Sequence, residues 1–279
     1  MKDYIKLLRV NHYIKNLLVF FPMFFRGVIF DSEKLIRAGL GFICLCFVSS
    51  AVYILNDYKD IEKDRNHPTK KSRPLASGRI RSQSAIIVMI ICLGVVLSVS
   101  VVLKSFEGAF CLALYLGINV AYCMGLKNKP IIDIVILASG FVIRVFYGGF
   151  LTDIPISKWL YLVVTTGSLY MGLGKRRNEL KAQTDTREVL KYYNEAFLDK
   201  NMYVCVGLAN MSYALWTLEM PNPRISWTIP IFIVIFMCYS LDVEGESDGD
   251  PVEVILKDRV LIAIILGYAI CIFSLLYIV

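Results

Sequence analysis

Charged side chains are scarce in this sequence. Lys, Arg, Asp and Glu make up 19% of the 279 residues, whereas 57% are hydrophobic. Soluble domains have about 25% charged and roughly 45–50% apolar residues. An ordinary soluble globule is therefore excluded, because it could not hide so much apolar surface from water.

Ligands for a soft metal are lacking as well. The only histidines are His12 and His67, and none of the eight cysteines forms a Cys-x-x-Cys pair. The cysteines all fall in or at the ends of apolar segments, where they behave as small hydrophobic residues. A zinc site built from His and Cys is not expected, so any metal must be held by oxygen ligands.

What the sequence does contain is a series of long apolar windows. A transmembrane helix needs about 20 mostly apolar residues, and nine windows of nearly that length occur. They lie near residues 12–30, 35–55, 83–103, 106–124, 131–151, 157–174, 201–220, 225–241 and 259–279. The connections are mostly too short to fold separately. We therefore predict one all-α domain over residues 1–279, a polytopic membrane protein with about nine transmembrane helices.

Lys and Arg are distributed unevenly between the two ends of these windows. The ends on the side of the N-terminus carry 23 of the 30 and the opposite ends carry six, with Arg144 inside a window. Because cytoplasmic loops are enriched in Lys and Arg, we predict a multi-pass protein of the cell membrane with its N-terminus in the cytoplasm. Four polar loops are predicted on the same side, near residues 56–82, 125–130, 175–200 and 242–258.

Basic and apolar residues alternate in the N-terminal segment. Residues 2–15 alternate Lys and Arg with Tyr, Ile, Leu and Val. This pattern suits a helix that lies on an anionic leaflet before the chain enters the bilayer. A frayed basic terminus is the alternative.

Oxygen ligands gather after the second window. Asn56, Asp57, Asp60 and Asp64 are spaced i, i+1, i+4 and i+8. If the helix continues past the bilayer boundary, three of them share one face and the fourth borders it. Stacked carboxylates repel unless a divalent cation lies among them, and Mg²⁺ prefers carboxylate and phosphate oxygens. The alternative is a solvated helix end, because basic residues are interleaved.

A basic stretch follows at once. Its cations are Lys70, Lys71, Arg73, Arg79 and Arg81. Pro and Gly residues among them predict a structured loop rather than a long helix. Arg binds phosphate oxygens in a bidentate fork and Lys acts as a point charge, so the two clusters together suit a metal-bound diphosphate. For each single cation, enforcement of membrane topology is the alternative.

These residues resemble a known family. The first aspartate-rich motif of the UbiA superfamily of intramembrane prenyltransferases is similar to Asn-Asp-x-x-Asp-x-x-x-Asp at residues 56–64, His-Pro-Thr-Lys at 67–70 and Arg-Pro-Leu-Ala-Ser-Gly at 73–78. The motif is long and specific, and the resemblance covers essentially the whole chain. It implies a UbiA-type helical bundle, in agreement with nine predicted helices.

The second half of the site resembles one branch of that superfamily. Its ordinary members carry a second aspartate-rich motif, which holds a second Mg²⁺ on a prenyl diphosphate. Here Leu137 stands where the partner of Asp133 is expected. The sequence is similar instead to the decaprenyl-phosphate phosphoribosyltransferase branch, in which a Tyr and a Lys precede a lone Asp. The corresponding residues here are Tyr122 and Lys127. The segment Ser-Gly-Phe-x-Ile-Arg of that branch matches residues 139–144.

Further segments match the same branch. They are Gly-Ser-Leu-Tyr-Met at 167–171, Gly-Lys-Arg at 174–176 and Tyr-Ser-Leu-Asp at 239–242, ahead of an acidic loop. The opening of the chain departs from the branch pattern Arg-Pro-x-Gln-Trp-x-Lys-Asn. Lys15 and Asn16 align with it, but Asn11, His12 and Tyr13 replace other residues.

The resemblance implies a phosphoribosyltransferase. It would move 5-phosphoribose from phosphoribosyl diphosphate to a polyprenyl, decaprenyl-like phosphate and release diphosphate, with Mg²⁺ as the cofactor. The metal ligands are Asn56, Asp57, Asp60 and Asp64. The catalytic residues are Lys15, Asp57, Asp60, Asp64 and Asp133. The substrate-binding residues are Asn16, Asn56, Lys70, Arg73, Tyr122, Lys127, Arg144, Tyr170, Lys175 and Arg176.

The chemistry of the donor agrees with this assignment. Phosphoribosyl diphosphate carries a diphosphate on C1 and another phosphate on C5, so it needs one metal and several cations rather than two metals. Additional cations are Lys127, Lys129, Lys175, Arg176 and Arg177. A prenyl donor has no use for a second phosphate pocket. Anchoring at the cytoplasmic face is the alternative for each cation.

Arg144 is an ionisable residue well inside a window. Such residues usually face the bundle interior or a cavity. It lies 11 residues after Asp133, close to three turns or roughly 16 Å of helix, so both point the same way. Arg144 is predicted either to attract the phosphate of the acceptor or to pair with a buried acid.

Two other functions are alternatives to this one. A prenyltransferase acting on an aromatic or quinone-precursor acceptor needs a second acidic pair, for which Asp133 and Asp242 are the candidates. A transporter often shows internal repeats, and no second copy of the 56–64 text occurs. The predicted partners are the lipid bilayer, the polyprenyl phosphate and phosphoribosyl diphosphate, with no nucleic acid. Assembly into a homo-oligomer is left open.

Overall fold

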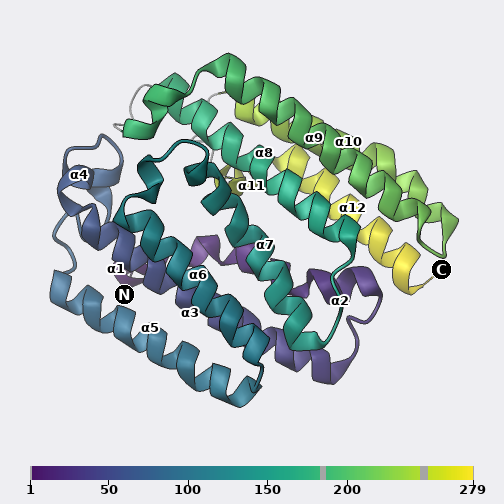
Figure 1. Cartoon of the computed structure of the whole chain (residues 1–279), viewed down its shortest axis with the longest axis horizontal. Helices are drawn as coiled ribbons and strands as arrows, with labels where there is room; N and C mark the ends of the chain where they lie inside the picture. Colours follow the sequence, from purple (N-terminus) through teal and green to yellow (C-terminus); the bar gives the residue numbers. More distant parts are fainter. Residues whose placement is uncertain (1, 183–186, 246–250, 279) are drawn as a thin grey trace. The chain divides into compact units, whose positions relative to one another are not determined.

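The computed structural model describes residues 2–182, 187–245 and 251–278, and every secondary-structure element in these ranges is helical. The elements are α1 (Lys2–Leu8), η1 (Val10–Phe20), α2 (Phe21–Arg26), α3 (Ser32–Lys59), α4 (Ile61–Arg65), η2 (Lys70–Ser72), α5 (Ser82–Leu103), α6 (Phe106–Met124), η3 (Leu126–Asn128), α7 (Ile132–Thr152), α8 (Lys158–Ala182), η4 (Glu188–Tyr192), α9 (Glu195–Leu218), η5 (Pro223–Thr228), α10 (Ile229–Glu244), α11 (Pro251–Lys257) and α12 (Arg259–Tyr277) (Figure 1). Those labelled η are 3₁₀ helices. The all-α prediction is confirmed.

Six helical stretches in the described part of the chain are long and apolar enough to cross a membrane. They are α3, α5, α6, α7, the run Pro223–Glu244 and α12. The most apolar windows of α5 and α12 are only 17% and 11% buried, so most of their apolar side chains face outwards. Faces of this kind suit lipid tails, which are as apolar as leucine. α8 and α9 have sufficient length but are less apolar.

Most predicted windows fall on helices. The windows at 83–103, 106–124 and 131–151 agree with α5, α6 and α7 to within one residue at either end. α3 and α8 continue beyond their apolar windows, to Lys59 and Ala182. The extensions carry polar residues, which is why hydropathy alone ended these helices too early.

The first window, 12–30, was wrongly predicted as one α-helix. The chain forms the 3₁₀ segment η1 and then the short helix α2. Arg9 has a left-handed backbone with φ 52°, which ends α1 after Leu8. Pro22 lies in the first turn of α2, where its missing N–H leaves no gap in the hydrogen bonding. The surface helix expected over residues 2–15 is therefore limited to α1.

The chain divides into two compact units. Unit 1 comprises Met1–Lys129 with Ile143–Pro155, and unit 2 comprises Pro130–Val142 with Ile156–Val279. Helix α7 contributes residues to both. The single domain expected over residues 1–279 stays a prediction.

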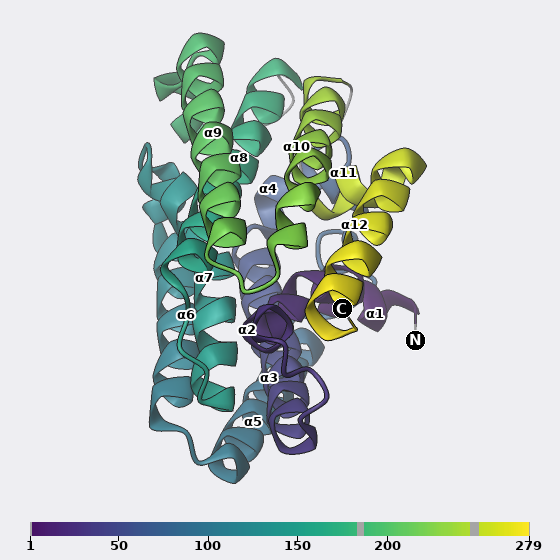
Figure 2. The same ribbon diagram turned by 90° about the vertical axis from the view of Figure 1, so that its right-hand side faces the viewer.

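Unit 1 is built around α3. Figures 1 and 2 show α5 alongside it, and a buried core joins α3, α6, η1 and the second half of α7 through Val19, Leu45, Leu112 and Tyr147. The backbone of η1 lies directly on α7, since a Cβ added at Gly148 would come within 2.0 Å of the Val19 carbonyl oxygen. Only glycine permits this approach.

Unit 2 is built around α8 and α9, which lie side by side in both views (Figures 1 and 2). Its core joins them to the first part of α7, to α10 and to α12, through Ile134, Leu173, Leu198, Val243 and Leu261.

Candidate active site

The acidic motif lies at the junction of α3 and α4. Asp60 ends α3 and begins α4. Its N–H donates to the Asn56 carbonyl oxygen at 3.0 Å, and the Asp64 N–H donates to the Asp60 carbonyl oxygen at 2.8 Å. Helical hydrogen bonding therefore continues through the junction. Asn56, Asp60 and Asp64 keep the i, i+4 spacing that the sequence predicted.

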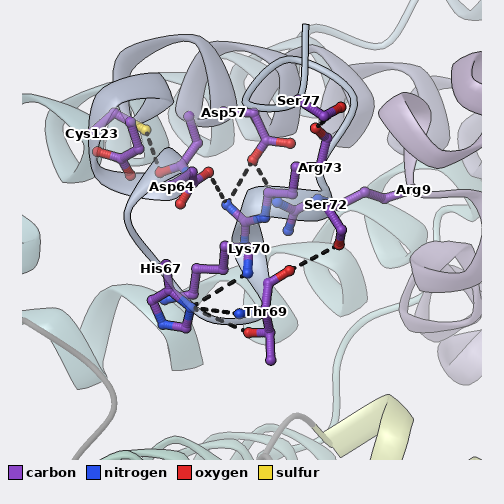
Figure 3. Close-up of polar contacts among 12 residues, drawn as sticks. Arg9, Asp57, Asp64, His67, Thr69, Lys70, Ser72, Arg73, Ser77 and Cys123 are labelled. Atoms are coloured by element: carbon purple, nitrogen blue, oxygen red, sulfur yellow. Dashed lines mark hydrogen bonds and ion pairs between the residues drawn. The ribbon is translucent and has the colours of Figure 1, made fainter. Parts of the chain in front are cut away.

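Asp57 and Asp64 are joined by one guanidinium. Nη1 of Arg73 donates to Oδ1 of Asp57 at 3.1 Å and to Oδ2 of Asp64 at 2.7 Å (Figure 3). Both carboxylates are buried, with 3% and 6% of their side-chain surface exposed. One oxygen of each carboxylate thus faces a single point, and a protein cation lies there. We call Asp57, Asp60 and Asp64 the carboxylate cluster.

A second guanidinium reaches Asp57 from the N-terminal segment. Nη2 of Arg9 donates to the same Oδ1 of Asp57 at 2.6 Å. Its guanidinium carbon also lies 4.6 Å from the centre of the Tyr53 ring, a cation–π distance. The left-handed backbone of Arg9 is what turns the side chain towards α3 instead of continuing α1.

The third carboxylate has its own cation. Nζ of Lys127, in η3, donates to both oxygens of Asp60, at 2.7 and 2.8 Å. Both side chains are about four-fifths buried. Three carboxylates are therefore matched by three cations, Arg9, Arg73 and Lys127. A neutral cluster of this composition tolerates burial that isolated charges would not.

Burial changes the pKa of one carboxyl in the carboxylate cluster. The pKa of the Asp64 carboxyl is raised above its ordinary value because burial disfavours the charged form, although the Arg73 guanidinium acts in the opposite direction. The neighbouring Asp57 and Asp60 charges raise it further. A positive partner is thus important for keeping Asp64 ionised.

The loop between α4 and α5 is a folded structure that fixes Arg73. Leu75 and Ile80 are buried against Leu7, Ile54 and Ala85, so the loop is anchored to α1, α3 and α5. Gly78 closes it with φ 74°, a left-handed conformation that favours glycine. The loop predicted from the Pro and Gly residues is confirmed.

Lys70 lies in a tight turn of that loop. The imidazole Nδ1 of His67 accepts hydrogen bonds from the backbone N–H of Thr69 at 3.3 Å and of Lys70 at 3.4 Å (Figure 3). The histidine therefore acts as a cap for the turn in this structure. Lys70 belongs to this turn, and its side chain is half-buried.

A buried polar network links η1 to α7 within unit 1. Nε of Arg144 donates to Oδ1 of Asn16 at 2.8 Å, and Nη2 donates to the Tyr115 hydroxyl at 3.0 Å. The three side chains are almost fully buried. Lys15, the neighbour of Asn16 in η1, is half-buried. Arg144 thus has a structural role in holding η1, and its binding to the acceptor phosphate stays a prediction.

Unit 2 holds a second charged network. Nε of Arg176 donates to Oδ2 of Asp133 at 2.5 Å, and the Tyr193 hydroxyl donates to Oδ1 of Asp133 at 2.6 Å. Arg176 also pairs with Glu179. The side chains of Asp133 and Arg176 are both fully buried. The backbone N–H of Ile131 donates to the Tyr193 hydroxyl at 2.6 Å, which anchors the start of α7.

The remaining predicted residues are placed as follows. Asn56 accepts a hydrogen bond from the Cys123 thiol at 3.5 Å. Tyr122 and Lys175 are half-buried on α6 and α8. Tyr170 is buried in unit 2, where its hydroxyl is hydrogen-bonded to Ser240.

The carboxylate cluster has the chemistry of a Mg²⁺ site. Carboxylate and amide oxygens are hard ligands of the kind this ion takes. The oxygens of Asp57 and Asp64 already converge on the cationic nitrogen of Arg73. Among residues 2–182, 187–245 and 251–278, no three His, Cys, Asp or Glu side chains are gathered closely enough to hold a metal as they stand. A metal bound by these two oxygens would take the place of the Arg73 nitrogen.

Sequence reasoning missed Arg9 and Tyr193. Arg9 was assigned to the membrane surface with the other basic residues of the N-terminal segment, and Tyr193 was not considered. The contact from Arg9 to Asp57 spans 48 positions and that from Tyr193 to Asp133 spans 60, so no local pattern reveals either.

Apolar helices with outward-facing apolar surfaces, together with a neutralised carboxylate cluster, define this chain as a multi-pass integral membrane protein of the all-α class. It belongs to the UbiA prenyltransferase family, which residues 18–185 match.

Two relatives extend the match over nearly the whole chain. Decaprenyl-phosphate phosphoribosyltransferase of Mycolicibacterium smegmatis is 34% identical over 95% of this chain and 89% of its own length. The protein described in the same words from Corynebacterium glutamicum is 32% identical over 98% of this chain and 86% of its own length.

The fold is shared with a UbiA homologue from Archaeoglobus fulgidus that was solved bound to DMAPP and Mg²⁺. The TM-score is 0.75 at 18% identity, covering 98% of this chain and 99% of that one. The UbiA-type fold implied by the sequence motifs is confirmed.

Proposed function

We propose that this protein is an intramembrane phosphoribosyltransferase that moves 5-phosphoribose from phosphoribosyl diphosphate to a polyprenyl phosphate. The observation that carries this proposal is the match, at 32–34% identity over almost the full chain, to relatives described as decaprenyl-phosphate phosphoribosyltransferases. The decaprenyl chain length belongs to those relatives. For this chain we propose a polyprenyl phosphate of that kind.

Further support comes from the surroundings of Asp133. Both of its oxygens are engaged by Arg176 and Tyr193, and its side chain is fully buried. The next position at helical spacing is Leu137. A second metal on a prenyl diphosphate would need ligands here that this arrangement does not offer.

In the proposed site, Asn56 and the carboxylate cluster hold the cofactor. Mg²⁺, when bound, supplies charge that stabilises the diphosphate as it leaves. Arg73 and Lys127, which contact the carboxylates at 2.7–3.1 Å, are close enough to bind phosphate oxygens beside them. Lys70 adds a cation on the same loop, and Lys175 is proposed to bind phosphate from α8.

The reaction requires little proton chemistry. The bond between C1 of the ribose and the diphosphate oxygen breaks, and the diphosphate takes the electron pair. An oxygen of the acceptor phosphate forms the new bond to C1. A phosphate monoester is already anionic, so no general base is needed. Catalysis then depends on positioning and on stabilising a positively charged, oxocarbenium-like state.

The proposed orientation places the carboxylate cluster at the cytoplasmic face. Phosphoribosyl diphosphate is water-soluble and would arrive from that side, while the lipid acceptor would enter from the bilayer. The excess of Lys and Arg at this end of the helices supports the orientation.

The test is direct. Purified protein, in detergent or reconstituted in lipid vesicles, is incubated with Mg²⁺, a polyprenyl phosphate, an aromatic acceptor and either labelled phosphoribosyl diphosphate or a labelled prenyl diphosphate, and lipid products are identified by mass spectrometry. We expect a polyprenyl phosphoribosyl phosphate with the first donor only. Transfer of a prenyl group to an aromatic acceptor would favour the prenyltransferase, and uptake of substrate into vesicles without any product would favour a transporter.

A further inference from the structure

We propose that Arg9 and Arg73 are exchangeable counter-ions of the carboxylate cluster, so that Mg²⁺ and the diphosphate of the donor bind together and each binds weakly alone. This inference rests on the proposed function only in taking a diphosphate as ligand. It concerns the order and coupling of binding, not the group that is transferred.

The first observation is a competition for one position. Nη1 of Arg73 lies between Oδ1 of Asp57 and Oδ2 of Asp64, at 3.1 and 2.7 Å (Figure 3). A metal ion that binds both oxygens must occupy the same place. Metal binding is thus an exchange, in which Arg73 has to leave its two carboxylates.

The second observation is that Arg9 shares the same acceptor atom. Oδ1 of Asp57 receives both Arg9 at 2.6 Å and Arg73 at 3.1 Å. The two arginines come from distant parts of the chain, one preceding η1 and the other following η2. Asp57 and Asp64 with these two guanidiniums sum to zero charge. Addition of a divalent cation alone would therefore leave the cluster with a net charge of plus two.

The third observation concerns access. The carboxylate side chains of Asp57 and Asp64 are only 3% and 6% exposed, whereas those of Arg9 and Arg73 are 20% and 26% exposed. The arginines are therefore more accessible than the carboxylates, and a diphosphate can reach them without first reaching the carboxylates. A guanidinium released from a carboxylate can bind phosphate oxygens in the same bidentate manner.

These observations determine the sign of the coupling. Mg²⁺ alone would strand two partly buried guanidiniums, which is unfavourable. Diphosphate alone would face carboxylates that repel it. Together, the metal takes the carboxylates and the arginines take the phosphates, so every charge keeps a partner. Because such coupling is reciprocal, each ligand must tighten the binding of the other by the same factor.

The experiment measures binding of Mn²⁺, a paramagnetic substitute for Mg²⁺, to the full-length protein in detergent by electron paramagnetic resonance. Titrations are run with and without inorganic diphosphate, for wild type, Arg73→Gln and Arg9→Gln. Arg79→Gln is the matched control, because Arg79 is a cation of the same loop that pairs with Asp3 and the Ser72 carbonyl instead of the carboxylate cluster.

For wild type, diphosphate is expected to tighten Mn²⁺ binding by about tenfold or more, the equivalent of ~1.4 kcal/mol. In Arg73→Gln and Arg9→Gln, Mn²⁺ alone should bind more tightly than to wild type, and the gain from diphosphate should shrink. Arg79→Gln should behave as wild type. Chelation of Mn²⁺ by diphosphate in solution is measured in a protein-free titration and subtracted, so the wild-type comparison and the differences between proteins both report on the site.

Two outcomes overturn the proposal: Mn²⁺ affinity that is unchanged or lower in both arginine variants, or wild type that binds Mn²⁺ equally well with and without diphosphate. Arg9→Gln leaves the Arg73 bridge between Asp57 and Asp64 in place, so it covers the case in which Arg73→Gln does not fold. Inorganic diphosphate is common to ribosyl and prenyl donors. Failure of the coupling is thus distinguishable from failure of the proposed donor.

Discussion

At the scale of single residues, the most enclosed charges belong to Asp133 and Arg176. Asp133→Asn removes the negative partner of a fully buried guanidinium. Unpairing a buried charge costs about 3–5 kcal/mol, and we expect the lower end because Glu179 still pairs with Arg176. Thermal unfolding in detergent should show a large loss of stability.

Tyr193→Phe should be destabilising to a smaller extent. The hydroxyl donates to Asp133 and accepts from the Ile131 N–H, so its removal leaves the buried Asp133 carboxylate and the Ile131 N–H each short of a partner. A loss of about 1–3 kcal/mol is expected, against less than roughly 0.5 kcal/mol for Tyr192→Phe, whose side chain lies at the surface. Equal stability of the two variants would show that the network has no structural importance.

Burial also distinguishes two residues that were predicted to bind the donor, Arg176 and Lys127. Arg176 is engaged by two acids inside unit 2, whereas Lys127 pairs with one carboxylate and is partly exposed. Lys127→Gln should therefore weaken binding of phosphoribosyl diphosphate by one to two decades, or about 1.5–3 kcal/mol, with a smaller effect on an analogue that lacks the C5 phosphate. Arg176→Gln should instead lower the unfolding temperature.

Comparing phosphoribosyl diphosphate with the analogue that lacks the C5 phosphate shows whether Lys127 binds the C5 phosphate. Lys129→Gln is the matched control, because Lys129 is an exposed cation two residues away. If Lys127→Gln affects both donors equally, Lys127 does not contact the C5 phosphate. Lys127 would then be assigned to the diphosphate, which both ligands carry.

Sequence patterns predicted which charged side chains belong to the site, but not which of them form ion pairs with one another. The spacing of Asn56, Asp60 and Asp64 is local, so it correctly predicted a shared helical face. The pairing of Asp133 with Arg176 and of Asp57 with Arg9 depends on segments that are brought together only by folding. A lone sequence cannot distinguish a carboxylate that awaits a ligand from one that already has a protein partner.

At the scale of elements, the contact of η1 with α7 is the most sensitive. Gly148→Ala would place a Cβ 2.0 Å from the Val19 carbonyl oxygen and 2.8 Å from its carbon, both backbone atoms that cannot yield. We expect a poorly folded protein with low thermal stability. Gly117→Ala in α6 meets no atom within 4 Å and should be neutral or stabilising by up to about 1 kcal/mol.

Activity adds a second measurement to this comparison. η1 carries Lys15 and Asn16, so any Gly148→Ala protein that does fold should lose transferase activity as η1 is displaced. Normal activity and stability would mean that the close approach is not required.

Element boundaries were predicted well where apolar composition alone decides them. α5, α6 and α7 are predominantly apolar along their whole length, and their windows agreed within a residue. The first window failed because hydropathy does not distinguish one long α-helix from a 3₁₀ segment followed by a short α-helix. The left-handed residue Arg9, which separates α1 from η1, has no signature in composition.

At the scale of the whole molecule, the motifs correctly predicted the family and the fold, because the resemblance covers essentially the whole chain. The distribution of Lys and Arg predicts the orientation of the chain in the membrane. The polar loop predicted at 242–258 includes residues 246–250, which lie outside the described residues. The loop between α4 and α5 and the start of α8 are better places for a test.

Orientation can be measured by labelling single introduced cysteines with a membrane-impermeant maleimide. Five of the eight native cysteines are buried and the other three are half-buried, so background labelling should be low. Ser72→Cys lies in the loop after α4 and Ser157→Cys precedes α8, and both positions are exposed. In intact cells we expect labelling of Ser157→Cys only, and in inside-out vesicles of Ser72→Cys only, because 23 of the 30 Lys and Arg residues lie on the side of Ser72. The reverse pattern would place the carboxylate cluster on the outer face, away from cytoplasmic phosphoribosyl diphosphate, and the proposed donor would have to be abandoned.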